Sequence, residues 1–108
     1  MDKQELEKHL HVDLYQHDFV DFQDVVGSYR ANVTEDDIII IQADYTYEDY
    51  SGDSSVYFYD KRDNLFYEVH GGHCSCYGLE DQWEPEVIGD LDFFKAYLVK
   101  QGQQRLLK

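Results

Sequence analysis

Apolar residues recur with helical spacing at the start of the chain. Leu6, Leu10 and Leu14 lie four residues apart, so they would line one side of an α-helix. Asp2 stands where an N-cap residue is preferred. The pattern predicts one amphipathic helix from about residue 3 to residue 14, whose apolar side covers part of the core.

A second helix is predicted near the end of the chain. Leu91, Phe94 and Leu98 would share one helical face. Asp90 can cap the start of this helix, and Gly102 stands where a left-handed residue ends one.

The middle of the chain favours strands. Ile38–Ile41 is an uninterrupted β-branched run bounded by acids, which predicts an interior strand buried on both faces. Two aromatic runs follow, Ser55–Tyr59 and Leu65–His70, and the five residues of Asp60–Asn64 separate them. A connection of that length predicts that the two runs pair as an antiparallel hairpin.

The segment between the first helix and the isoleucine run is less regular. Asp18–Val26 interleaves apolar residues with acids, so either a short helix or an irregular element fits it. Gly27 marks a break, after which Tyr29–Val33 fits a short strand.

The order of these elements indicates the fold class. Strands grouped between helices, with no alternating βαβ pattern, predict one acidic α+β domain over residues 1–108. Its sheet is expected to be an antiparallel meander of three to four strands, covered on one face by the N- and C-terminal helices.

The charge of the chain narrows the classes of partner. The 9 Lys and Arg against 23 Asp and Glu give a net charge of −14, which repels nucleic-acid backbones and anionic lipids. Direct binding to nucleic acid or to an acidic membrane is therefore not expected. Charged and polar residues separate the apolar ones among the first ten, which leaves no apolar segment of a signal peptide, so a cytoplasmic location is expected.

The acids are concentrated in the middle of the chain. Eight lie between Arg30 and Lys61 and eight more between Arg62 and Lys95, with no basic residue inside either stretch. One interpretation is a solvated surface that keeps the protein soluble and monomeric, and a minor one is cation binding. The other is a surface that occupies a basic groove of a nucleic-acid-binding protein, with carboxylates in place of phosphates.

Tyrosines alternate with acids in one segment of this central region. Tyrosine supplies contact area at low entropic cost, and carboxylates supply steering and register. The segment is therefore the predicted partner-binding site, and its residues are Asp44, Tyr45, Tyr47, Glu48, Asp49, Tyr50 and Asp53.

Four potential metal ligands lie close together in the sequence. They are His70, His73, Cys74 and Cys76. Histidine and cysteine are ligands that Zn²⁺ takes, so a small zinc module is the alternative function. Structural zinc sites usually draw on two separated ligand pairs, so no cofactor is expected, and the cysteines are interpreted as small buried residues. A thiolate activated by a neighbouring histidine is a further, enzymatic interpretation, although acidic surroundings raise a thiol pKa.

Several motifs resemble one protein family. Tyr47–Asp53, Tyr67–Val69 and the run HCSCYGLE at residues 73–80, followed by Trp83, Pro85 and Glu86, are similar to small uncharacterised proteins of bacteriophages and bacteria. The resemblance implies a phage-type factor that acts in the host cytoplasm. With the charge pattern, it favours a non-enzymatic acidic protein that inhibits a basic host protein, such as a nuclease or defence effector, by nucleic-acid mimicry.

Overall fold

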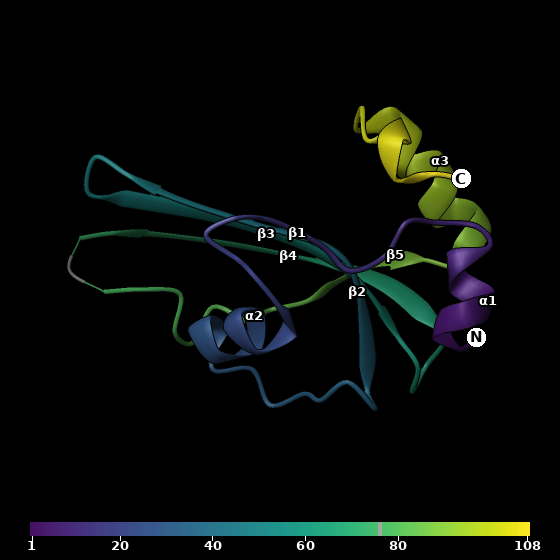
Figure 1. Ribbon diagram of the computed structural model, residues 1–108, viewed down its shortest axis with the longest axis horizontal. Helices are drawn as coiled ribbons and strands as arrows, with labels where there is room; N and C mark the ends of the chain where they lie inside the picture. Colours follow the sequence, from purple (N-terminus) through teal and green to yellow (C-terminus); the bar gives the residue numbers. More distant parts are fainter. Residues whose placement is uncertain (76) are drawn as a thin grey trace.

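A five-stranded mixed sheet forms the centre of the protein. The computed structural model describes residues 1–75 and 77–108. β1 runs parallel to β2, and every other pair of neighbouring strands is antiparallel. The strands lie side by side in sequence order (Figure 1): β1 (Leu14–His17), β2 (Ile38–Glu48), β3 (Ser51–Asp60), β4 (Leu65–Cys74) and β5 (Glu86–Gly89).

Helices cover both faces of this sheet. α2 (Phe22–Tyr29) packs on one face, and α1 (Lys3–Glu7), α3 (Leu91–Lys100) and the short 3-10 helix η1 (Gln104–Leu106) pack on the other (Figure 1). The α+β class is confirmed. The expected sheet of three to four antiparallel strands, covered on one face, is wrong in strand number, strand pairing and coverage, because five strands are present in the described residues, β1 is parallel to β2 and helices lie on both faces. None of the helices in the described ranges is long and apolar enough to cross a membrane.

The isoleucine run joins the two sides of the core. Ile38 and Ile40 pack in the cluster under α2, whereas Ile39 and Ile41 pack in the cluster under α3. β2 lies between β1 and β3, and the register shifts between Ile40 and Gln42. The prediction of an interior strand buried on both faces is confirmed.

The C-terminal helix follows its predicted pattern. Phe94 and Leu98 are fully buried in the cluster that contains Ile39 and Ile41, and Leu91 is partly buried against it. The Asp90 carboxylate caps the helix by accepting from the N–H of Phe93 at 2.9 Å. Gly102 has a φ of 71°, the left-handed conformation expected after the helix.

The predicted N-terminal helix over residues 3 to 14 is wrong in length. α1 ends at Glu7, Leu10 forms an isolated bridge with Leu107, and Leu14 begins β1. The leucines keep helical spacing because their separate elements pack on one core: Leu6 and Leu10 are fully buried in it, and Leu14 is partly buried against it. Tertiary packing, not a continuous helix, accounts for the pattern.

The segment before the isoleucine run folds as a helix. α2 begins at Phe22 after the N-cap Asp21, whose carboxylate accepts from the N–H of Asp24 at 2.9 Å. The expected break at Gly27 and the short strand over Tyr29–Val33 are wrong: α2 continues to Tyr29, and Arg30 ends it in the left-handed conformation. β1, α2 and β2 thus form a parallel βαβ unit. The sequence analysis expected no such unit, because it assigned Leu14, the first residue of β1, to the N-terminal helix.

The predicted aromatic hairpin is confirmed, and its second strand is longer than expected. Tyr59 pairs with Phe66 across the turn, and their rings lie 4.9 Å apart. β4 continues past His70 to Cys74, so His70 lies inside the strand and not at its end. β5 was not predicted, since four residues give too short a pattern.

Replacing Ile40 with Asp is expected to unfold the protein. The side chain is 1% exposed, and an unpaired charge there costs several kcal/mol, a large part of the about 5–15 kcal/mol by which typical domains are stable. Circular dichroism during thermal melting measures the effect. Val20→Asp, at a residue that is 74% exposed, is the control and should melt like the parent protein. A soluble Ile40→Asp variant with a cooperative, parent-like melt would contradict this core assignment.

Candidate binding surface at the projecting hairpin

Residues 44–55, in which the end of β2 turns into the start of β3, form the hairpin end of the sheet. Its tip is a two-residue turn of Asp49 and Tyr50, with φ values of 51° and 67°. In Figure 1 the tip points away from α1 and α3, along a molecule whose longest dimension is 40 Å. This turn lacks the Asn-Gly or Asp-Gly pair that usually marks one, so the sequence did not reveal the hairpin.

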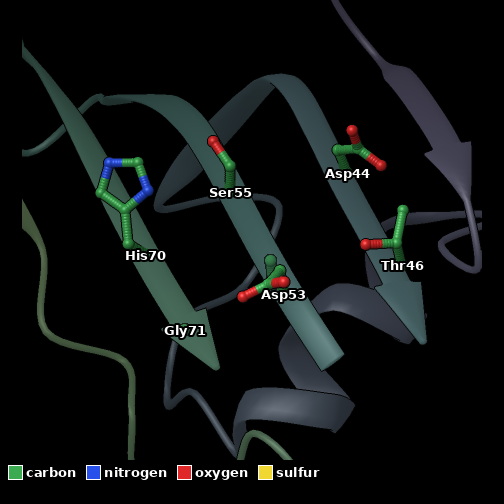
Figure 2. A pocket seen from close by; sticks show the side chains of 7 residues that line it. Asp44, Thr46, Asp53, Ser55, His70 and Gly71 are labelled. Carbon is green, nitrogen blue, oxygen red and sulfur yellow. The ribbon is translucent and has the colours of Figure 1, made fainter. Parts of the chain in front are cut away.

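One face of the hairpin end carries a polar hollow of about 320 Å³. It lies on the α3 side of the sheet, because the lining side chains other than Ser54, which faces α2, alternate along the strands with those on the α2 side. Figure 2 shows its carboxylates, hydroxyls and imidazole rising from three neighbouring strands. The lining residues are Asp44, Thr46, Asp53, Ser54, Ser55, His70 and Gly71.

The carboxylates of this face lack strong counter-ions. His17 Nδ1 lies 2.6 Å from Asp44 Oδ1, and His70 Nε2 lies 3.4 Å from a carboxylate oxygen of Glu68. In the described part of the chain, the ion pairs of lysine and arginine lie elsewhere, at Lys3 with Asp13 and Arg62 with Asp60. Within residues 1–75 and 77–108, the carboxylates of the hollow therefore form no ion pair with lysine or arginine.

The opposite face of the hairpin end is aromatic. His73 Nδ1 donates to the carbonyl oxygen of Cys74 at 2.7 Å, so in the neutral ring Nε2 accepts from the Tyr45 hydroxyl. The Tyr47 ring lies 5.2 Å from the His73 ring. Burial raises the pKa of Tyr45, which keeps its hydroxyl a donor at neutral pH.

Gly52 makes room for this aromatic group. A Cβ at position 52 would lie 2.3 Å from His73 Nε2, so any larger residue would displace the imidazole. The histidine ring lies across the backbone of β3, where its register partner is Gly52. Tyr45, Tyr47 and His73 therefore depend on a glycine that no local sequence pattern marks.

α2 supports the hairpin end from the aromatic side. The Tyr29 hydroxyl donates to Ser54 Oγ at 2.7 Å, beneath the hollow. Burial raises the pKa of Tyr29 to about 12, so the hydroxyl stays protonated as a donor. Trp83 packs edge-on against Tyr29 and stacks on Phe58, with centroid distances of 5.3 and 5.2 Å. The strands that carry the hollow are thus packed against α2 and Trp83 on their other face.

The structure brings the seven predicted binding residues into one hairpin and distributes them over three regions. Strand alternation places Asp44 and Asp53 on the α3 side and Tyr45 and Tyr47 on the α2 side. The tip carries Glu48, Asp49 and Tyr50, all exposed. The sequence prediction missed the polar contributors that come from other strands or alternate positions, which are His17, Thr46, Ser55 and His70.

The four metal candidates are not assembled into a site within the described residues. His70 and His73 lie three positions apart on β4, so they face opposite sides of the sheet. Cys74 is exposed, which corrects the expectation that it is buried, and Cys76 lies outside the described residues. In residues 1–75 and 77–108 no three histidine, cysteine or acidic side chains are placed to hold a metal ion.

No protein-family model, curated protein or solved structure matches the chain. The resemblance carried by the run at residues 73–80 therefore stays an expectation. The functional conclusion rests on the chemistry of the hairpin end itself.

Gly52→Ala is expected to destabilise the fold by about 1–2 kcal/mol, because the imidazole must leave its place and lose the hydrogen bond from Tyr45. Urea unfolding measures this. Gly27→Ala is the control: nothing lies within 4 Å of its added Cβ, so that helix is expected to gain stability. In a His73→Ala background the cost of Gly52→Ala should disappear, and an unchanged cost there would contradict the assigned contact.

Metal is expected to be dispensable for folding. Because the described ligand candidates are not grouped, purified protein should hold no stoichiometric zinc, and its melting temperature should not respond to a chelator. Elemental analysis with calorimetry tests both statements. One zinc ion per chain, lost together with thermal stability in Cys74→Ser, would contradict them and support the zinc module.

Proposed function

We propose that the protein is a non-enzymatic acidic interaction protein whose hairpin end binds a basic, nucleic-acid-binding protein. The observation that carries the proposal is the chemistry of residues 44–55, which contain four acids and no Lys or Arg. These acids stand on a projecting hairpin whose ion-pair partners, among the residues described, are limited to one histidine. Such a surface attracts cationic groups over the Debye length of about 8 Å at physiological ionic strength.

The polar hollow is suited to a lysine or arginine side chain of the partner. The carboxylates of Asp44 and Asp53 accept hydrogen bonds from an ammonium or guanidinium group, and the nearby hydroxyl of Ser55 can accept another. A hollow on three paired strands also orders little on binding, because its backbone is already hydrogen-bonded. This face therefore contributes specificity for a cation.

Exposed tyrosines supply apolar contact beside the charges. Tyr50 is 77% exposed at the tip, and Tyr47 is 45% exposed beside His73. Tyrosine is enriched at protein interfaces because it buries a large area while losing only two side-chain rotations. We assign to these rings the slow dissociation of the complex, and to the carboxylates its rapid association.

Nucleic-acid mimicry follows from the same chemistry. A basic groove that binds phosphates offers lysine and arginine donors, which carboxylates can engage equally. The net charge of −14 prevents the protein from binding nucleic acid itself. The protein would therefore compete with nucleic acid for the basic groove of the partner, and would not link the partner to its nucleic acid. A phage-type inhibitor of a basic host nuclease or defence effector fits these properties.

Binding to the basic partner is expected to weaken steeply between about 50 and 500 mM salt, because the Debye length then falls from above to below about 10 Å. Capture from host lysate on immobilised protein identifies the partner, and surface plasmon resonance against it measures the salt dependence. Nucleic acid should displace the protein. Binding that is insensitive to salt, or simultaneous binding of nucleic acid and this protein, would contradict the proposal.

Charge variants locate the contact. Glu48→Lys with Asp53→Lys should slow association about tenfold, whereas Asp36→Lys with Glu84→Lys changes the net charge equally at exposed acids outside the hairpin and should slow it much less. Tyr47→Ala should mainly speed dissociation. Asp49 is left unchanged because its positive φ favours aspartate.

A further inference from the structure

An apolar groove lies at the other side of the molecule, between the edge strand β5 and α3. Its volume is about 490 Å³. β5 is the last strand in the sheet, so within residues 1–75 and 77–108 one of its edges has no neighbouring strand to take up its backbone N–H and C=O groups. The groove is lined by Glu68, Val87, Ile88, Phe93, Ala96, Tyr97 and Lys100.

Two large apolar side chains of this groove face solvent. Phe93 and Val87 are each 59% exposed. Gly89, at a φ of 148°, lets the phenylalanine approach the strand closely, since a Cβ on it would lie 3.0 Å from Phe93 Cβ. The aromatic ring is thus held against the end of β5 while much of it stays in contact with water, which is typical of a recognition anchor.

The groove also carries negative charge. The Tyr97 hydroxyl donates at 2.8 Å to Glu68, whose side chain is 14% exposed. Burial, reinforced by this carboxylate, raises the pKa of Tyr97 to about 12, so the hydroxyl remains the donor. β5 and the start of α3, residues 86–94, contain three acids and no Lys or Arg. Lys100 is the basic residue of the lining, and it belongs to the last turn of α3.

We propose that this groove binds an extended basic segment of a partner protein, which adds a strand to β5 and places an apolar side chain against Phe93. Strand addition satisfies the open backbone edge, and the groove accepts alternate side chains of the added strand. Lysine or arginine at the intervening positions complements the acids of residues 86–94. A second copy of this chain is the less favoured occupant, because each copy brings a net charge of −14.

This contact goes beyond the hairpin end, because its preference for a basic segment rests on the acids of residues 86–94 and not on those of residues 44–55. The probe is the capped peptide Lys-Val-Lys-Leu-Lys-Val, added to isotope-labelled full-length protein at physiological salt and followed by NMR chemical shifts. We expect saturable shifts in β5 and α3. The same peptide with every backbone nitrogen methylated keeps its charge but has no backbone N–H to donate, so it cannot pair as a strand, and the peptide with Glu in place of Lys reverses the charge. Both should lose the shifts.

Matched variants test the anchor. Phe93→Ser should weaken peptide binding about tenfold, which corresponds to about 1.4 kcal/mol. Val99→Ser removes an apolar side chain that is 50% exposed on the same helix and does not line the groove, so it should change binding less than twofold.

Three outcomes would overturn the inference. They are shifts confined to residues 44–55, equal binding of the methylated peptide, and a dimer by sedimentation that Phe93→Ser dissociates, which would identify a second copy as the occupant. The first of these leaves the proposed function of the hairpin end standing. Partner capture that the hairpin variants leave unchanged, with peptide binding at β5 intact, would instead contradict the proposed function and leave this inference standing.

Discussion

The burial of four consecutive isoleucines on both faces of β2 is the constraint on which the rest of the structure depends. Ile38 and Ile40 require cover on one face, and Ile39 and Ile41 require it on the other, so α2 and the α1–α3 layer must lie on opposite sides. The apolar run ends at Ile41, and β2 continues for seven more residues to Glu48. Past Ala43 the strand carries polar and aromatic side chains, and the hairpin end projects with its tip away from α1 and α3 (Figure 1).

The parts of the fold that the sequence predicted are those in which one local pattern coincides with one element. The isoleucine run, the aromatic hairpin and α3 each have a pattern of this kind, with caps or turn residues at the ends. The N-terminal leucines failed because residues of separate elements, packed on one core, imitate a helical period. β1 and β5 are four residues each, which is too short for a period to be recognised.

The sequence predicts the candidate site as one continuous segment, whereas in the structure the site is a surface to which three neighbouring strands contribute. The alternation of Tyr45 and Tyr47 with Asp44 is a strand period of two, and it separates the tyrosines from the acid onto opposite faces. His73 reaches the tyrosines and His70 reaches the hollow only through the register of β4, which no local pattern encodes. Contacts of this kind require the pairing of strands, and a single sequence does not specify it.

The central claim is that the hairpin end is the surface that meets a basic partner. Amide hydrogen exchange of the protein, alone and in complex with the captured partner, tests it most directly, because exchange reports protection residue by residue. Binding through the hairpin predicts protection concentrated in residues 44–55 and weakened as salt is raised. Protection that is absent from those residues and confined to the helical layers would contradict it.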